Sequence, residues 1–332
     1  MPEHTGRADE VLVVGTSGVD TIVRVERLAV PEGDLAHVEP IRDYVAHSGT
    51  GWALGFHALG RPTSYLTYLG DDTQGRLVGE RFRAAGLRFE ALPAPLGTSR
   101  SVNLVDAEGR RFSFYDGRLP WELRLPPEVA LPYLERAAHV HVGPAGFTRD
   151  LPAELADRPV TTSTDVHAWD GRDAAMLPWA LGVDYFFMSA AALGDRAAGV
   201  LESVVERGRA RVAVATDGAR GCQVLARPEA GGDGRVRRFP AVTPPRAVVD
   251  SNGAGDAFAT AFLHAHLDGA PLERCVLAGA ISGAFAATQH GTHERHITVD
   301  ELAAATAEIT GETTGEGEGA VSRSGPAGWR WS

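Results

Sequence analysis

The sequence contains no lysine. All 32 of its basic residues are arginines, in a chain of 332 residues. A P-loop needs a lysine that reaches the outer phosphates, a protein kinase needs a strand lysine, and a pyridoxal enzyme needs a lysine for its Schiff base. These three classes are therefore excluded, and any cationic clamp on a phosphate has to be an arginine; Arg100 and Arg220 are candidates.

Cysteine, long hydrophobic runs and positive charge are also scarce. Two cysteines, Cys222 and Cys275, cannot form a disulfide framework, which indicates a reducing compartment. No stretch approaches the length of a membrane span, and the first ten residues lack the apolar centre of a signal peptide. The net charge of −11 argues against nucleic acid or an acidic membrane as the main partner. We expect a cytoplasmic protein whose partner is a small molecule.

Short β-branched runs alternate with helical segments along most of the chain. This alternation predicts an α/β fold with a doubly wound, mostly parallel sheet flanked by helices. Two more polar strand–turn–strand segments, about residues 21–43 and 98–117, would suit a small β lid, although ordinary surface hairpins would show the same pattern. We predict one domain over residues 1–310 and a flexible tail, rich in Gly, Glu, Ser and Thr, over residues 311–332.

The segment VVDSNGAGDAFATAF, from Val248 to Phe262, carries the strongest chemical signal. A helix that begins near its glycines has unpaired N–H groups and the positive end of its dipole there, so it can hold an anion. An aspartate at the same place would repel a phosphate and needs another purpose. General-base chemistry would supply one: Asp256 would take the proton of an attacking hydroxyl. A helix-capping aspartate beside packing glycines is the alternative.

With its flanking segments, this motif resembles the ribokinase-like (PfkB) family of carbohydrate and nucleoside kinases, over about residues 10 to 310. The run from Asp250 to Asp256 matches the family signature D-T-x-G-A-G-D, with Ser251 replacing Thr. The resemblance implies that Asp256 is the catalytic base and that the backbone amides of residues 253–256 (Gly253, Ala254, Gly255 and Asp256) form the anion hole. It implies ATP and Mg²⁺ as cofactors, with room for a monovalent cation. It also implies a homodimer, because lid hairpins often pair between subunits in this family.

Further landmarks follow from the same resemblance. The run ATDGARGCQV is similar to the nucleotide loop T-x-G-x-x-G, although a plain hairpin turn would also explain its glycines. On the nucleotide side the resemblance implies Thr216, Gly218, Gly221, Asn252, Gly253, Gly255 and His290. On the acceptor side it implies Asp20, the glycine-rich loop with Gly49 and Gly51, and Arg100 from the lid, next to the base Asp256.

The sequence departs from the family pattern in three places. Ser189–Ala192 stand where the family carries N-x-x-E, whose glutamate organises water around magnesium. The loss of this glutamate would weaken the positioning of the metal, unless another carboxylate, Asp165 or Asp184, substitutes for it. Ala46 and His47 stand where the acceptor loop has paired glycines, and Gly51 where it has an asparagine. The run STDVHAWDG places Asp165 and His167 at a strand end, where ligands bind in open α/β sheets, so both are candidates to contact the acceptor. A structural cluster at the strand end is the alternative. No set of histidines, cysteines and carboxylates has the spacing of a metal site, and we predict none.

These features together predict an ATP-dependent phosphotransferase that phosphorylates an alcohol hydroxyl of a sugar, nucleoside or related polyol. The missing N-x-x-E motif leaves an alternative open: a non-catalytic sugar- or nucleotide-binding regulatory protein on the same fold. The intact Asp256 favours the enzyme. The residues do not identify the acceptor, and they leave open whether another nucleotide replaces ATP as the donor.

Overall fold

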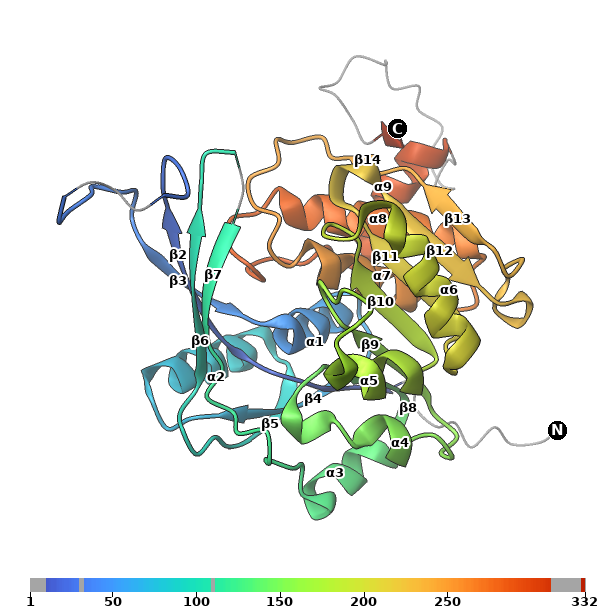
Figure 1. Cartoon of the computed structure of the whole chain (residues 1–332), viewed down its shortest axis with the longest axis horizontal. Helices are drawn as coiled ribbons and strands as arrows, with labels where there is room; N and C mark the ends of the chain where they lie inside the picture. Colours follow the sequence, from blue (N-terminus) through green and yellow to red (C-terminus); the bar gives the residue numbers. More distant parts are fainter. Residues whose placement is uncertain (1–9, 30–32, 109–110, 312–329, 332) are drawn as a thin grey trace.

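A nine-stranded sheet forms the centre of the molecule, in the order β13-β12-β11-β10-β9-β8-β1-β4-β5 (Figure 1). The structure, a computed structural model, describes residues 10–29, 33–108, 111–311 and 330–331. Seven strands pair in parallel; β12 pairs antiparallel with β11, and the edge strand β13 pairs antiparallel with β12. The strands are β1 (Glu10–Val14), β4 (Thr63–Leu69), β5 (Arg88–Pro93), β8 (Ala137–Val142), β9 (Thr161–Asp165), β10 (Tyr185–Ser189), β11 (Val212–Thr216), β12 (Cys222–Ala226) and β13 (Val236–Phe239).

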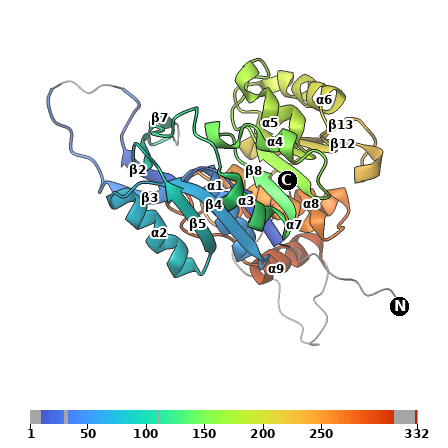
Figure 2. The ribbon, with the colours of Figure 1, turned by 90° about the horizontal axis from the view of Figure 1, so that it is seen from below.

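Helices cover both faces of this sheet, which confirms the predicted doubly wound architecture. One hydrophobic core joins the sheet to α3 (Pro127–Leu134), α4 (Leu151–Glu154), α5 (Leu177–Gly182) and α6 (Ala197–Arg207). The core on the other face joins it to α1 (Ser48–Ala58), α2 (Thr73–Ala85), α7 (Ala254–Leu267) and α8 (Leu272–Ala287) (Figure 2). The last helix, α9 (Val299–Thr310), packs against α8. No helix among the described residues is long and apolar enough to span a membrane.

A second sheet of four strands stands apart from the main sheet (Figure 1). Its order is β3-β2-β6-β7, built from β2 (Gly18–Arg24), β3 (Arg42–Ala46), β6 (Ser99–Val105) and β7 (Arg111–Asp116). These strands fall within or next to the two segments that interrupt the alternation in the sequence. Side chains alternate between the two faces of a strand, so this sheet has two distinct faces. The face that carries Asp20 and Arg24 is turned toward the main domain, because both side chains contact residues there.

The chain end forms a third, two-stranded sheet. Its strands are β14 (Val242–Thr243) and β15 (Arg330–Trp331), which pair antiparallel. Most of the tail predicted to be flexible, residues 312–329 and 332, lies outside the described residues. Of the described part, Trp331 packs against two of the hydrophobic cores.

Candidate functional site

Helix α7 begins at the glycine-rich motif, and its first turn has a backbone that only glycine allows. Gly253 is the N-cap, with φ 75°. A Cβ at this position would lie 2.3 Å from the backbone oxygen of Thr292. The loop that contains Thr292 therefore closes directly against the start of α7, and any side chain at residue 253 would push the two apart.

Gly255 serves a different purpose from Gly253. A Cβ built on Gly255 would meet no atom within 4 Å, so this side of the helix start is open. The N–H groups of Gly255 and Asp256 have no backbone acceptor within the described part of the chain, whereas the N–H of Ala254 donates to the oxygen of Ser251. Free N–H groups at the positive end of a helix dipole make this opening suitable for an anion.

Asp256 lies in the first turn of α7 and is buried. Its Oδ1 accepts a hydrogen bond from Ser48 Oγ at 2.6 Å, and its Oδ2 lies 3.6 Å from His293 Nε2. Burial and the negative charge of Asp165 together raise the pKa of Asp256 to about 7, against the lowering effects of His167 and of the hydrogen bond from Ser48. A carboxylate with a pKa near neutrality can accept a proton and release it at physiological pH.

Asp165 is the second carboxylate at this place. It ends β9, its side chain is buried, and its Oδ1 accepts the backbone N–H of His167 at 2.7 Å. Asp184 instead precedes β10, at the other end of the strands, where it bonds Thr162 and forms an ion pair with Arg209. Of the two candidates for the missing glutamate, only Asp165 lies near Asp256.

Mg²⁺ prefers oxygen ligands and is commonly held by one or two carboxylates together with substrate phosphates. Asp165, close enough to Asp256 to raise its pKa, fits that donor set. Among the described residues, no three His, Cys, Asp or Glu side chains are grouped to hold a metal by themselves. An ion here would therefore depend on oxygens from a bound nucleotide.

Asp20 lies on the inner face of the small sheet, the face turned toward the main domain. Its Oδ2 accepts a hydrogen bond from Thr292 Oγ1 at 3.2 Å, and its Oδ1 lies 3.8 Å from His47 Nε2. In the strand register Asp20 is next to Ser101, which is next to Tyr115, so the three share this face. Arg100 precedes Ser101 and lies on the opposite face, so the structure does not bring it together with Asp20.

The two glycines expected in the acceptor loop bring helices close together. A Cβ on Gly49 would lie 2.5 Å from the hydroxyl of Tyr65, and one on Gly51 would lie 2.3 Å from His293 Cε1 and 2.9 Å from Asp256 Cβ. Their backbones thus let α1 approach the main sheet and Asp256. Any direct contact of these glycines with an acceptor would be made by their backbone atoms.

The expected nucleotide loop joins two antiparallel strands. Thr216 ends β11, Gly218 has φ 54°, and Gly221 has φ 86°, with a Cβ position only 2.0 Å from the oxygen of Phe239. The loop is thus a hairpin turn at the carboxyl end of β11. Asp165 lies at the carboxyl end of β9, so both are on the same side of the parallel sheet. Arg220 is exposed and paired with Asp217 at 2.6 Å, so here it contacts the loop itself.

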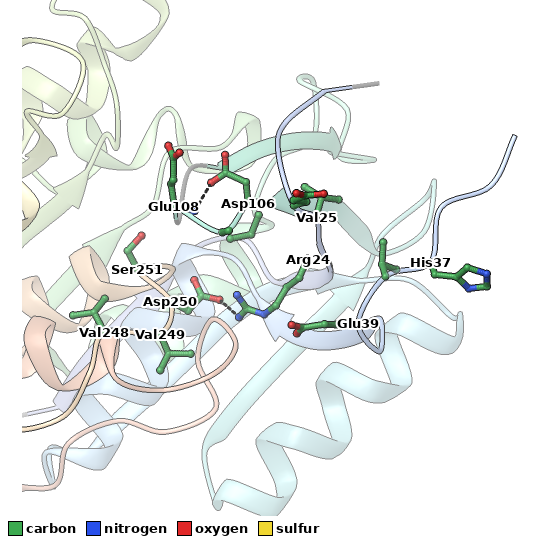
Figure 3. A pocket seen from close by; sticks show the side chains of 14 residues that line it. Arg24, Val25, His37, Glu39, Asp106, Glu108, Val248, Val249, Asp250 and Ser251 are labelled. Atoms are coloured by element: carbon green, nitrogen blue, oxygen red, sulfur yellow. Dashed lines mark hydrogen bonds and ion pairs between the residues drawn. The ribbon is translucent and has the colours of Figure 1, made fainter. Parts of the chain in front are cut away.

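Two arginines of the small sheet contact the motif before α7. Arg24 Nη2 lies 3.5 Å from Asp250 Oδ2, and Arg111 donates to Asn252 Oδ1. Arg24 and Arg111 are aligned across the sheet through Val105. Figure 3 shows Arg24 directed at Asp250; both residues, together with Ser251, line a cavity of about 700 Å³ between the small sheet and the loop that precedes α7. His290 lies near enough to Asp250 to lower its pKa, although burial raises that pKa overall.

Sequence reasoning did not find four of the residues that surround the motif: Ser48, His293, Arg24 and Arg111. Ser48 had one local signal, because it directly follows the departure at Ala46 and His47. His293 stands between His290 and His296 in the sequence, a spacing that carries no signal of a contact with Asp256. The two arginines stand in ordinary strand sequence, and their contacts span 226 and 141 residues, so nothing local marks them.

Comparisons with known proteins agree on one kind of protein. A family model described as pfkB family carbohydrate kinase matches residues 187–298. The acarbose 7(IV)-phosphotransferase of Actinoplanes sp. is 46% identical over 289 residues, which are 87% of this chain and 94% of that protein. The structure of a microbiome-derived acarbose kinase superposes with a TM-score of 0.81 at 42% identity, over 90% of this chain and 98% of that one. Ribokinase from Thermotoga maritima, at 19% identity and a TM-score of 0.69, shares the fold over 89% of this chain and 98% of its own.

Proposed function

The chain belongs to the pfkB family of carbohydrate kinases and is a small-molecule kinase, and we propose that it transfers the γ-phosphoryl group of ATP to acarbose or a related oligosaccharide-like polyol. The observation that carries the proposal is Asp256, a buried carboxylate with a pKa of about 7 beside free N–H groups at the start of α7. The acceptor class follows from the similarity to an acarbose phosphotransferase over 87% of the chain.

In the proposed reaction Asp256 accepts the proton of the acceptor hydroxyl. The freed oxygen forms a bond to the γ-phosphorus while the bond to the oxygen bridging the β- and γ-phosphates breaks, and ADP leaves. The hydrogen bond from Ser48 holds one carboxylate oxygen of Asp256, so the other oxygen, Oδ2, is the one we assign to the proton. A base with a pKa near neutrality matches this step, because it is ionised often enough to act and basic enough to accept.

The start of α7 would hold the transferred phosphoryl group. Within the anion hole expected at residues 253–256, the free N–H groups of Gly255 and Asp256 lie at the opening that Gly255 leaves, and we assign them to the phosphoryl group. Arg24 and Arg111, which contact Asp250 and Asn252 beside it, are the cations of the small sheet placed to approach the phosphates. We therefore assign the cationic clamp to them in place of Arg100 and Arg220.

Kinases of this family use ATP, and we place the rest of the nucleotide along Thr216, Gly218, Gly221 and His290, with Asn252 next to the phosphates. Bound Mg²⁺ would offset the negative charge of the phosphates. Asp165 is the residue of this chain that we expect to hold it. The small sheet would act as a lid over an acceptor bound between Asp20 and Asp256, with Asp165, His167 and the backbone of Gly49 and Gly51 at its edges.

We also propose a homodimer formed through the outer face of the small sheet. Phe112 and Phe114 lie on that face, 54% and 59% exposed, and Val102 beside them is 37% exposed. Apolar side chains gathered on an exposed face mark an association surface.

The buried, free cysteines Cys222 and Cys275 agree with the expected cytoplasmic location.

The proposal is tested by an acceptor screen with ATP and Mg²⁺. Release of ADP is followed with acarbose, maltotriose, ribose and a nucleoside as acceptors, and the phosphorylated product is identified by mass spectrometry. We expect turnover with acarbose and little with ribose or the nucleoside. Turnover with none of them would contradict the proposed reaction. A regulatory protein without turnover is not favoured, because the similar proteins over most of the chain are kinases.

A further inference from the structure

His47 has a backbone conformation that belongs almost only to glycine. It is the N-cap of α1, with φ 74° and ψ 151°, and its side chain makes no capping hydrogen bond to the helix. A residue with a Cβ is strained in this region, and such strain persists where the surrounding structure imposes it, typically at functional sites. The helix gains nothing from histidine that glycine would not provide at lower cost.

The side chain of His47 carries a second cost. It is only 8% exposed, and neither ring nitrogen has a hydrogen-bond partner among the residues that the structure describes. Buried polar atoms are nearly always paired, because an unpaired one loses its bonds to water without replacement. A strained backbone and an unsatisfied ring at one position indicate a partner that binds from outside the chain.

The surroundings of His47 define that partner. Its Nε2 is 3.8 Å from Asp20 Oδ1, too far for a hydrogen bond, while the other oxygen of Asp20 already accepts from Thr292. The ring of Tyr115 lies 5.6 Å away, tilted by 55°. Burial lowers the pKa of His47, and His167 lowers it further against the opposing charge of Asp20, so the imidazole is neutral and offers one N–H donor. His293 lies near the same ring.

We propose that His47 is a specificity-determining residue that, with Asp20, holds one hydroxyl of a sugar-like acceptor. The hydroxyl donates to Asp20 Oδ1 and accepts from His47 Nε2–H. An oxygen about 2.8 Å from both atoms spans the gap that is too wide for a direct bond. Tyr115 supplies an apolar surface for the sugar ring at the same place. This inference rests on the proposed function and adds the group that recognises the acceptor.

Packing alone is the competing explanation. The ring of His47 lies against Gly18, where a Cβ would come within 2.4 Å of its Cε1. If His47 serves packing alone, its replacement should destabilise the protein and change the KM for acarbose and the KM for ATP together. If His47 binds the acceptor, its replacement should change the KM for acarbose alone, and His47→Gly should also relieve the backbone strain.

His47→Gly and His47→Asn separate the two explanations. For each we would measure the melting temperature, the KM for acarbose, the KM for ATP and the kcat. We expect His47→Gly to raise the KM for acarbose by about tenfold or more, because the acceptor hydroxyl loses the hydrogen bond from His47 and keeps only the one to Asp20. The KM for ATP should stay within about twofold, and the melting temperature should not fall. His47→Asn keeps an N–H donor, so its KM for acarbose should lie between those of the other two proteins.

An unchanged KM for acarbose in His47→Gly would overturn the inference, as would a lower melting temperature with both KM values altered together. Calorimetric binding of acarbose without ATP keeps the inference separate from the proposed function. If the wild-type protein binds acarbose without phosphorylating it, the proposed reaction fails, while weaker binding by His47→Gly still supports the inference. If the wild-type protein does not bind acarbose, or both proteins bind it equally, the inference fails.

Discussion

The hydroxyl of Ser48 donates a hydrogen bond of 2.6 Å to Oδ1 of Asp256, across 208 residues of sequence. Ser48 begins α1 and Asp256 lies in the first turn of α7, so the contact joins the starts of two helices that pack together. The bond stabilises the ionised carboxylate, whereas burial and the charge of Asp165 favour the protonated form. The pKa of about 7 is therefore a balance that single substitutions can move in either direction.

Ser48→Ala should move the activity profile to higher pH. Without its hydrogen bond the ionised form of Asp256 is less stable, so its pKa rises and a smaller fraction is ready to accept a proton at neutral pH. We expect kcat/KM for the acceptor to reach half its maximum at higher pH than in the wild-type protein, with a loss at pH 6.5 that shrinks by pH 9. A loss that is equal at every pH would mean that Ser48 only positions the carboxylate.

Asp165→Asn should move the same profile to lower pH. The substitution removes the negative charge that raises the pKa of Asp256 and keeps an oxygen that can accept the N–H of His167. The midpoint is measured at saturating ATP and Mg²⁺, since Asp165 is also our proposed magnesium ligand. Midpoints of Ser48→Ala and Asp165→Asn that move in the same direction would contradict this electrostatic account.

Asp256→Asn should abolish turnover while stabilising the protein at alkaline pH. Removal of a general base costs about 10²- to 10⁴-fold in kcat, and nucleotide affinity should remain. The pKa of Asp256 is raised from 3.8 unfolded to about 7 folded, so its contribution to stability is fully present below pH 4 and is lost as pH rises through 7.

The variant does not lose this contribution. Its free energy of unfolding relative to the wild-type protein should therefore improve by up to about 4 kcal/mol between pH 4 and pH 8. Denaturant titrations at the two pH values measure the difference. A relative stability that is the same at both would show that Asp256 ionises as it does in water.

Gly255→Ala and Gly253→Ala form a matched pair that separates binding from folding. Alanine at 255 meets no atom within 4 Å, so the melting temperature should hardly change, but its methyl group lies where the phosphate approaches. We expect its KM for ATP to rise or its kcat to fall by about tenfold or more. Alanine at 253 has φ 75° and meets the oxygen of Thr292 at 2.3 Å, so it should destabilise the fold by about 1–3 kcal/mol or more. Wild-type kinetics in Gly255→Ala would remove the anion hole from the proposal.

Trp331→Ala should lower the melting temperature by several degrees. Trp331 pairs with Val242 and packs against two hydrophobic cores, and truncation of a partly buried tryptophan loses apolar contact area. Arg330→Ala, next to it and exposed, is the control and should leave the melting temperature unchanged. Equal melting temperatures for all three proteins would instead support the prediction from the sequence that residues 311–332 form a flexible tail.

Much of the fold could be predicted because its signals are local. The helix of residues 73–85 has Asp72 as its N-cap and Gly86 as its C-cap, and both residue types at these positions are sequence signals of a helix end. The strand runs are short and β-branched, and their alternation with helices is enough to predict a parallel sheet. The pairing of Trp331 could not be predicted, because its partner strand has only two residues, too few to show a strand's alternation of side chains.

The residues of the candidate site also fall into two groups, those that are neighbours in the sequence and those that only the fold brings together. Asp256 and its glycines stand together in one motif, because a helix start requires its capping glycine and its first-turn residues to be neighbours in the chain. The partners of that motif come from elsewhere. Ser48, His293, Arg24 and Arg111 meet it only after the two sheets and their helices have packed.

The sequence by itself determined the α/β architecture, the family and the position of the proposed base, since periodicity, turn residues and a contiguous motif are properties of short segments. Only the tertiary structure decided the surroundings that set the pKa of Asp256 and which arginines lie beside its motif. Burial and charges from distant segments set a pKa, and the register of the small sheet puts Arg24 on the inner face and Arg100 on the outer one. The strain at His47 is likewise visible only in the tertiary structure, because a histidine in the sequence gives no sign that residue 47 has φ 74°.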